Sequence, residues 1–520
     1  MTVNHRYPSL PAFIKAGLYA FLLFFSLSSL SLAASAENVK DVKFSHQTVL
    51  DLAKKLATEP YKLPKQAPIS LTRLDAETYQ KIRFQQHAAI WGNSPSPFSI
   101  QLFAPGFLYK NLVNIDIVES GKSVPINVTE SSFKVPNPGI AKALAQVGKY
   151  AGFRLHYPLN NSQDKNEFII FQGASYFRAV SKGQLYGISA RGLAIDVAEP
   201  KGEEHPTFTH FWIERPGREQ KAIVVHALLN SKSVTGAYRF GIYPDDPTHM
   251  DVKVTLFPRV DIPHIGLAPL TSMFLHGGMV PSKSTDYRPE VHNSQALAIT
   301  TGNNEHLWRP LNNPSSLQIS GFMDEHTKGF GLIQRDRQFV NYQDLEAHYE
   351  LRPSLWVEPI EDWGKGQVQL FEIPSNADSN DNIVAYWRPE GGLKKGQTFS
   401  YNYRLIWLND INPMPGKTKI VRSAKGQPSE DGNRVMIIDF SHISAEQLKT
   451  LSINASSNHG KIVKTKLIAN PNIDGARVFL TFNPENADVA ELRLQLMNKN
   501  TPISETWLYR WIKPSLFTGE

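Results

Sequence analysis

The chain has 520 residues, with 55 Lys and Arg against 48 Asp and Glu, a formal net charge of +7, and no cysteine. A small positive excess over this length, without a basic cluster, argues against nucleic acid binding, and the missing thiols exclude disulfides and thiolate metal sites. A chain this long can bury enough apolar surface to fold without such cross-links.

The first 36 residues have the pattern of a cleaved signal peptide. Arg6 and Lys15 precede an apolar run over residues 16–32, and residues 34–36 (Ala-Ser-Ala) form a small-residue cleavage site. A membrane anchor is the alternative, but serines interrupt the run and no basic cluster follows it. No Arg-Arg pair precedes the run, which favours the Sec route. We therefore expect a periplasmic protein that is not embedded in a membrane.

Helices are expected to be few and short. Each of three segments starts with a capping residue, and the third also ends in a glycine. The three predicted helical segments, with their caps, are residues 45–56, 75–84 and 137–148. We expect them at the periphery of a β scaffold.

Short apolar or alternating runs between turn residues predict strands over most of the remaining chain. The predicted strands before residue 400 are 98–103, 167–171, 184–188, 208–214, 222–229, 237–242, 251–257, 297–301, 331–335, 367–373 and 382–387. Their number and spacing indicate a mainly β chain. Residues 37–408 are expected to form a large antiparallel β-sandwich.

The character of the chain changes after residue 408. Residues 409–426 are rich in Pro, Gly and Lys and are expected to be a linker. Residues 427–520 contain several short strand patterns, and Leu492, Leu494 and Leu496 alternate with polar residues, which marks one buried face. This pattern resembles a C-terminal immunoglobulin-like β-sandwich without the cysteine pair of antibody domains.

Several familiar catalytic motifs are missing. The segment from Gly187 to Arg191 (Gly-Ile-Ser-Ala-Arg) lacks the second glycine of a nucleophile elbow, so a serine hydrolase is disfavoured. No phosphate-binding loop or dinucleotide fingerprint is found, and no two histidines are spaced as a helical zinc pair. We expect no metal and no cofactor.

Three segments combine acids, arginines and aromatic residues: 287–294, 305–313 and 372–387. Sugars present apolar faces that stack on Trp or Tyr, and hydroxyl groups that bond Arg, Asn and carboxylates. The alternative is that these aromatic residues belong to the core and the acids pair with neighbouring arginines. Composition by itself does not decide between a carbohydrate site and this structural interpretation.

Specific blocks of the sequence resemble the osmoregulated periplasmic glucan biosynthesis proteins, types G and D. The blocks are YRPEVHNSQAL, LWRPLNNP, GFGLIQRDR, LRPSLWVEP, WGKGQVQLFEIPSN, NDNIVAYW, TGAYRFGIYP and GASYFRAVSKGQLYGISARGLAID. The resemblance covers essentially the whole mature chain, and the Sec-like leader fits type G better. It implies a large β-sandwich with a long cleft, followed by an immunoglobulin-like domain. It also implies that the protein is required for the synthesis of glucans with a β-1,2-linked backbone.

The resemblance also implies inverting hydrolysis of β-1,2-glucan. Asp381 matches the general acid of the family, and an aspartate in a His-Asp-Ser block is its proposed base acting through water. Here this chain departs from the pattern, because it has His292-Asn293-Ser294, and an amide cannot accept the proton as a carboxylate does. If Asn293 occupies the base position, the remaining candidates are Glu290, Asp378 and Glu372. The residues expected to bind sugar are Tyr287, Arg288, His292, Trp308, Arg309 and Trp387.

The sequence therefore leaves two alternative functions. One is a glucan-processing enzyme with Asp381 as the acid. The other, motivated by Asn293, is a non-catalytic binding partner that presents β-1,2-glucan to the inner-membrane glucan synthase. A purely structural adhesin or chaperone is disfavoured, since it would not need so many clusters of Arg, acids and aromatic residues.

Overall fold

Two large β-sheets contain most of the strands. The computed structural model describes residues 43–282, 286–411, 418–426 and 429–514. The chain is mainly β, as predicted, with several antiparallel sheets. The predicted signal peptide lies outside the described residues, as does part of the predicted linker. No helix in the described part of the chain is long and apolar enough to cross a bilayer.

The ten-stranded sheet carries the candidate site. Within the described residues it runs in the order β2-β6-β7-β8-β9-β15-β24-β23-β20, with β10 beside β15. Its strands are β2 (Ser99–Phe103), β6 (Gly152–Tyr157), β7 (Asn166–Gln172), β8 (Tyr176–Ala179), β9 (Ser189–Arg191), β10 (Ala194–Ile195), β15 (Ile265–Ser272), β20 (Gln318–Glu325), β23 (Lys365–Glu372) and β24 (Ile383–Pro389).

The fifteen-stranded sheet, counted over the same described residues, runs β28-β31-β33-β19-β18-β21-β22-β25-β14-β13-β12-β11-β3-β4, with β32 beside β31. Its strands are β3 (Asn114–Glu119), β4 (Lys122–Pro125), β11 (Thr207–Glu214), β12 (Ile223–Asn230), β13 (Val234–Tyr243), β14 (Thr248–Pro258), β18 (Ala296–Thr300), β19 (His306–Pro310), β21 (Gly329–Ile333), β22 (Ser354–Pro359), β25 (Phe399–Leu408), β28 (Leu451–Ser457), β31 (Val489–Asn498), β32 (Thr501–Pro502) and β33 (Thr506–Ile512).

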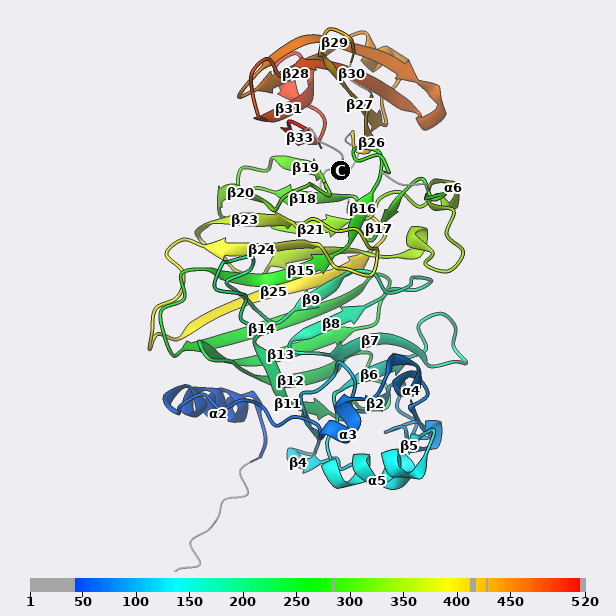
Figure 1. The fold of residues 1–520 in the computed structure, drawn as a ribbon, viewed down its shortest axis with the longest axis vertical. Coiled ribbons are helices and arrows are strands. Elements are labelled where there is room, and N and C mark those ends of the chain that lie inside the picture. Colours follow the sequence, from blue (N-terminus) through cyan, green and yellow to red (C-terminus); the bar gives the residue numbers. More distant parts are fainter. Residues whose placement is uncertain (1–42, 283–285, 412–417, 427–428, 515–520) are drawn as a thin grey trace, which may run out of the picture. The chain divides into compact units, whose positions relative to one another are not determined.

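Strands of both large sheets are labelled in Figure 1, and aromatic side chains join the two sheets into one core. Phe153 on β6 and Phe171 on β7 lie 5.0 and 5.5 Å, centroid to centroid, from Phe211 on β11. Phe171 also lies 5.2 Å from Phe240 on β13. Because side chains alternate between the two faces of a strand, each large sheet has one face in this core and one face outside it.

The C-terminal segment continues the fifteen-stranded sheet. β19 pairs in parallel with β33 through Trp308 and Trp507. A four-stranded sheet, β26-β27-β30-β29, shares a second core with β31 and β33. Its strands are β26 (Ile420–Lys425), β27 (Arg434–Ser441), β29 (Lys461–Asn470) and β30 (Gly475–Asn483). Leu492, Leu494 and Leu496 are buried, as their alternation predicts. The predicted linker and domain boundaries stay predictions.

The helices are short, and the first and third match their predictions closely. Asn137 caps α5 by accepting a hydrogen bond from Ile140 N, and Gly148 ends it in a left-handed conformation with φ of 61°. Asp75 caps α4 as predicted, but that helix ends at Gln80 instead of Phe84. The helices are α2 (His46–Thr58), α3 (Ile69–Thr72), α4 (Ala76–Gln80), α5 (Pro138–Val147), α6 (Phe339–Tyr342), α7 (Ala445–Leu448), η1 (Gln86–Ala88), η2 (Glu130–Ser132), η3 (Tyr349–Leu351) and η4 (Pro471–Ile473).

Two strand pairs stand outside the large sheets, and one predicted strand is wrong. The pairs are β1 (Arg83–Phe84) with β5 (Phe133–Lys134), and β16 (Phe274–His276) with β17 (Val291–His292). Residues 184–188, predicted as a strand, contain none. Gly187 there packs against Arg352, whose Cβ would lie 2.9 Å from a Cβ at position 187. This close approach, and not strand pairing, explains the glycine.

A buried ion-pair network ties the C-terminal strands to the main body. Arg335 donates to both oxygens of Glu505, at 2.9 and 3.0 Å, and its guanidinium lies 3.9 Å from the ring centre of Trp308. Arg335 also donates to Asp410 at 2.9 Å, and Glu505 accepts from Ile420 N at 2.8 Å. The Arg335 and Glu505 side chains are only 6 and 2% exposed. Each buried charge is therefore compensated by the other elements of the network.

Replacing Glu505 with Ala should destabilise the protein by about 3–5 kcal/mol, because it leaves much of the buried Arg335 charge and Ile420 N without their acceptor. The free energy of unfolding in denaturant measures this loss. The control is Asp488→Ala, whose exposed pair with Lys513 should leave stability nearly unchanged. Equal effects of the two substitutions would contradict a structural role for the buried pair.

Candidate functional site

Arg178 lies on the outer face of the ten-stranded sheet. Its neighbours on β8, Phe177 and Ala179, point into the shared core, so Arg178 between them points away from it. Its Nε donates to Ser189 Oγ at 2.6 Å. Ser189 is fully buried and serves as an acceptor, which agrees with the rejection of a nucleophile elbow at this position.

Arg191 on β9 extends this polar face. It lies opposite Tyr176 of β8, and its guanidinium is 4.7 Å from the centre of the Tyr176 ring. Its Nε donates to Thr271 Oγ1 on β15 at 2.8 Å, and its Nη1 pairs with Glu203. The charge of Arg191 is therefore compensated locally. The two arginines occupy adjacent strands because the sheet pairs β8 with β9.

The loop that carries Asp381 connects β23 to β24. Asn382 closes its base, because its side chain accepts from Phe274 N at 2.8 Å and donates to the Phe274 and Ile373 carbonyls at 3.0 Å. Asn313 holds the middle of the loop by bonding the backbone of Ser375 at 2.8 and 2.9 Å. Asp381 thus lies at the end of a clamped loop, separated from the buried strand β24 only by Asn382, and this restricts where its carboxyl group can lie.

The Asp381 carboxyl lies in a crowded, positively charged environment. Its Oδ2 is 3.7 Å from Arg178 Nη2, and its side chain is 29% exposed. Desolvation by the surrounding protein raises the pKa of Asp381, and the positive charges of Arg178, Arg191 and Arg352 offset only part of that rise. A carboxyl group with a raised pKa favours the protonated form, which is the form that a general acid needs.

Asn293 reaches the same site through Arg352. The Asn293 side-chain oxygen accepts from Arg352 Nη1, its side-chain nitrogen donates to Gly187 O at 3.5 Å, and its backbone N donates to Met273 O at 2.8 Å. Asn293 is 5% exposed. Arg352 therefore contacts Asn293 directly, whereas its charge acts on Asp381 only at longer range.

Arg288 binds three carboxylates from three different loops. It donates to Asp286, to Asp344 at 2.9 Å and to Asp378 at 2.9 Å. The hydrogen bond with Asp286 is the largest of the interactions that raise the pKa of Arg288, followed by those with Asp344 and Asp378. Burial raises the pKa of Tyr349 to about 12, so its hydroxyl stays neutral, and it lies 3.5 Å from Asp378. Arg288 thus holds the loop before Asp381 in place.

A hollow of about 570 Å³ lies beside this loop. Its lining is rich in Asn, Ser and Pro: it comprises Leu275, His276, Val280, Pro281, Ser282, Asn313, Pro314, Ser315, Pro374, Ser375, Asn376 and Asn380. Its volume and polar groups suit a small ligand or a section of an oligosaccharide. Tyr287 is 75% exposed and is available for stacking on a sugar face.

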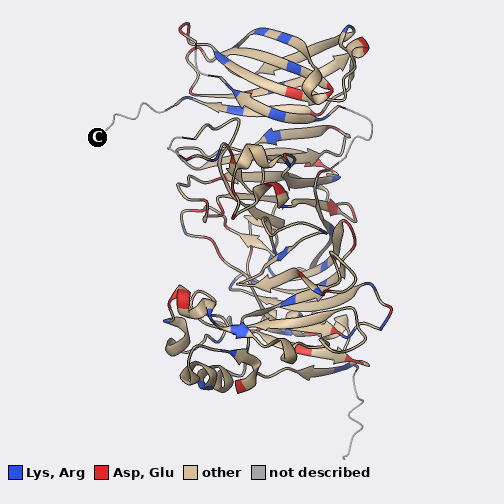
Figure 2. Ribbon diagram, turned by 90° about the vertical axis from the view of Figure 1, so that its right-hand side faces the viewer, with Lys and Arg blue, Asp and Glu red and all other residues tan. Residues whose placement is uncertain are grey.

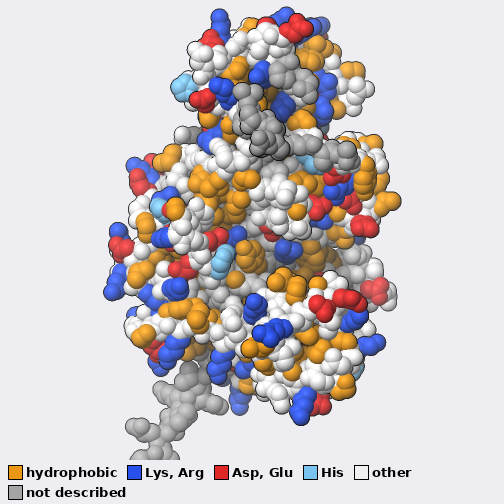
Figure 3. Space-filling model, viewed as in Figure 1, with side chains coloured by type: hydrophobic (Ala, Val, Ile, Leu, Met, Phe, Trp, Pro, Cys, Tyr) orange, Lys and Arg blue, Asp and Glu red, His pale blue; other side chains and the backbone are white. Residues whose placement is uncertain are grey.

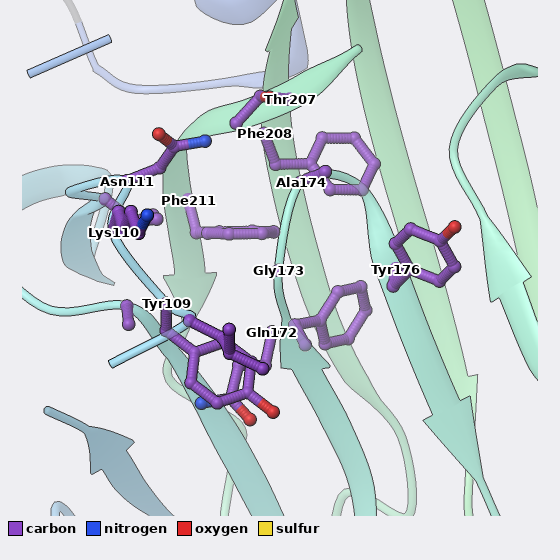
Figure 4. Close-up of a pocket in the computed structure, with 14 residues that line it drawn as sticks. Tyr109, Lys110, Asn111, Gln172, Gly173, Ala174, Tyr176, Thr207, Phe208 and Phe211 are labelled. Atoms are coloured by element: carbon purple, nitrogen blue, oxygen red, sulfur yellow. The ribbon is translucent and has the colours of Figure 1, made fainter. Parts of the chain in front are cut away.

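A second hollow has Tyr176 in its lining and is shown in Figure 4. Gln172, Phe208 and Phe211 lie around it, and Tyr176 stands at the side away from Lys110. Its volume is only about 60 Å³, which holds a few water molecules but not a sugar ring. It does not extend the candidate site.

Several residues expected to bind sugar belong to the core instead. Trp387 is fully buried and Trp308 is 2% exposed, so neither ring can stack on a ligand in this conformation. Arg309 and Glu372 are 2 and 1% exposed and lie 3.5 Å apart, with Glu372 also accepting from Asn312 N at 2.6 Å. Burial raises the pKa of Glu372, and solvent cannot reach it as it must reach a base.

His292, which is buried, and Glu290, whose side chain is 20% exposed, form a separate pair. His292 Nε2 lies 2.8 Å from Glu290 Oε2, and its Nδ1 lies 2.8 Å from Gln334 Oε1. Burial raises the pKa of Glu290, but the hydrogen bond and charge of His292, with Arg422, lower it overall. Both residues line a small hollow next to β26 together with Trp308 and Arg422. Neither makes a described contact with Asp381.

Arg178, Arg191, Arg352, Tyr349 and Asp344 are site residues that the sequence did not single out. The three arginines lie within the blocks that carry the family resemblance, and Arg352 precedes Pro353, which favours the extended conformation observed for it. Their residue type alone does not distinguish them from surface arginines. Figures 2 and 3 show that Lys and Arg are interspersed with Asp and Glu over the molecule, so charge composition does not locate the site.

Comparison with known proteins gives a consistent result. Residues 44–511 match the model of the family described as "Periplasmic glucan biosynthesis protein, MdoG". Glucans biosynthesis protein G 2 of Shewanella oneidensis is 59% identical, over 94% of this chain and 93% of that one. Glucans biosynthesis protein G of Vibrio cholerae is 43% identical, over 91 and 87%. A galactose mutarotase related enzyme from Lactobacillus acidophilus has a TM-score of 0.22 and 10% identity, over 57 and 97%, which is too low to support an argument.

Asp381→Asn should stabilise the fold at pH 7. The pKa of Asp381 is higher in the folded protein than in the unfolded chain. Ionisation of Asp381 therefore lowers the free energy of unfolding as the pH rises from the unfolded pKa through the folded pKa. The gain from Asn should shrink as pH falls towards about 3.9, the unfolded pKa of Asp, where wild type also carries a neutral group. Unfolding free energies of both proteins at pH 4 and pH 7 test this; a wild type more stable than the variant at pH 7 contradicts the electrostatic assignment.

Proposed function

This chain belongs to the periplasmic glucan biosynthesis family, and we propose that within this role it binds a β-1,2-linked glucan and cleaves it with inversion. The family and the names of the relatives support a part in periplasmic glucan biosynthesis. We place the mature protein in the periplasm, after removal of residues 1–36. The glucan occupies the outer face of the ten-stranded sheet, with Tyr287 and the hollow beside the Asp381 loop as contact surfaces.

The position of Asp381, partly exposed at the end of a clamped loop and 3.7 Å from Arg178, carries the proposal, and its raised pKa supports it. In inverting hydrolysis, a carboxyl group gives its proton to the glycosidic oxygen as the bond to the anomeric carbon breaks. Water attacks that carbon from the opposite face and gives its proton to a base. Asp381 stands at the end of a rigid loop, with partial access to solvent, and supplies the first of these protons.

The base is the weaker half of the site. Asn293 cannot accept the proton, Glu372 lies in a buried pair with Arg309, and Glu290 is bound to His292. Asp378 is 40% exposed, is held by Arg288, and lies in the loop that carries Asp381. We therefore assign activation of the water molecule to Asp378. Turnover is slow, because Arg288 sets the position of the Asp378 carboxylate, which is not the base position that Asn293 occupies.

The second candidate function is binding without cleavage, in which the protein presents glucan to the inner-membrane synthase. The observation that favours it is the Asn293 side chain, which bonds Arg352 where the family pattern has a carboxylate. A binding protein needs the exposed Tyr287, the hollow and the arginines, but not a base.

Digestion of linear β-1,2-glucan separates the two functions. We expect wild type to release short oligosaccharides slowly, and Asp381→Asn to reduce the rate by roughly 100- to 10,000-fold, because proton transfer to the leaving oxygen is lost. Asn293→Asp should increase the rate by restoring a carboxylate at the base position. Product analysis by chromatography measures all three, with Asp488→Asn as an exposed control outside the loop.

Equal release by wild type and Asp381→Asn would falsify the role of Asp381 as the acid. Tight glucan binding with no release by wild type or Asn293→Asp would establish the binding function instead. A calorimetric titration with the same glucan provides the binding measurement for each variant, independently of turnover.

A further inference from the structure

Arg352 has neutral hydrogen-bond partners only. Its Nη1 donates to Asn293 Oδ1, its Nε and Nη2 donate to Ala347 O at 3.1 Å, and its guanidinium lies 4.3 Å from the ring centre of Tyr349. Among the described residues, no carboxylate oxygen lies within 4 Å of it. A partly buried guanidinium without a carboxylate is unusual, because buried charges are normally paired.

The nearby carboxylates do not neutralise the positive charge of Arg352. Asp344 and Asp378 act on Arg352 only at longer range, and both are bound by Arg288. Arg178 repels Arg352, and its own counter-charge is Asp381 at 3.7 Å. When Asp381 is protonated, as the proposed acid must be, Arg178 loses that counter-charge. Two guanidiniums then face the site without a carboxylate of their own.

We propose that Arg352 and Arg178 form a subsite for an oxyanion, a phosphate or carboxylate group carried on the glucan. This inference rests on the proposed function and names the class of glucan that the site prefers. Guanidinium groups bind phosphate and carboxylate through charge-assisted hydrogen bonds, and the Arg178 side chain is 44% exposed and accessible to a ligand. Arg178 contributes to the subsite beside Asp381, and Arg352 contributes to it beside Asn293.

Asn293 explains why this chain would have such a subsite. A carboxylate at position 293 would pair with Arg352 and neutralise it from within the protein, whereas the amide leaves the charge available to a ligand. The alternative interpretation is that Arg352 and Arg178 bond neutral sugar hydroxyl groups. The two interpretations differ in one property: only the oxyanion subsite discriminates between charged and neutral ligands.

Inorganic phosphate is the first probe. Titration calorimetry at constant ionic strength should detect binding to wild type, and both Arg352→Gln and Asn293→Asp should weaken it by roughly 10- to 100-fold, the value of a charged hydrogen bond. Arg404→Gln is the matched control, because Arg404 already has a carboxylate partner in Asp251 and should leave phosphate binding unchanged. The Asn293→Asp variant keeps Arg352 in place, so its result does not depend on the folding of Arg352→Gln.

The second arm uses a linear β-1,2-glucooligosaccharide with and without one phosphate ester. Wild type should bind the phosphorylated form roughly 10- to 100-fold more tightly, and Asn293→Asp should remove the difference. Equal affinity for both forms, or phosphate binding unchanged by Asn293→Asp, overturns the subsite. Binding of free phosphate without preference for the ester also overturns it, since the site would then serve a free anion.

Asp381→Asn separates this inference from the proposed function. If cleavage is absent but the phosphorylated oligosaccharide is still preferred by wild type and Asp381→Asn, the subsite stands and the hydrolase proposal fails. If cleavage depends on Asp381 while charged and neutral oligosaccharides bind equally, the hydrolase proposal stands and the subsite fails.

Discussion

The alternation of side chains across the ten-stranded sheet is the constraint on which the rest of the site depends. Phe177 and Ala179 bury one face of β8 in the shared core, and that burial forces Arg178 to the opposite face. A shift by one residue would place the arginine in the core, at a large energetic cost. Packing of the two sheets therefore determines both the stability of the body and the direction in which the site residues point.

The site is organised around guanidinium groups. Arg352 bonds Asn293, Arg288 ties together three loops, and Arg178 lies 3.7 Å from Asp381. These charges oppose the raised pKa of Asp381 and would oppose positive charge on the sugar in an oxocarbenium-like transition state. An anion bound by Arg352 and Arg178 would weaken both effects of their charge, on the pKa of Asp381 and on the positively charged transition state. The proposed subsite and the proposed chemistry are therefore electrostatically consistent.

Local sequence patterns were sufficient to predict several elements of the fold. Asn137 and Gly148 delimit α5, and alternating leucines identify the buried face of β31, because caps and strand periodicity act through residues close in sequence. The predicted strand at residues 184–188 failed for the opposite reason. Its glycine is required by the side chain of Arg352, more than 160 residues away, and no local pattern contains that contact.

The sequence by itself determined the mainly β class and the family, since these depend on residue identity and short motifs, and it singled out Asp381 and Asn293 as candidate site residues. Only the tertiary structure decided which aromatic and acidic residues are accessible. Trp308, Trp387 and Glu372 have the residue types of a sugar site, yet they lie in the core, whereas Arg178 and Arg352 were not singled out by type. Burial and charge pairing arise between distant segments. The physical environment of each side chain, and with it the arginine-rich character of the site, exists only once the sheets have packed.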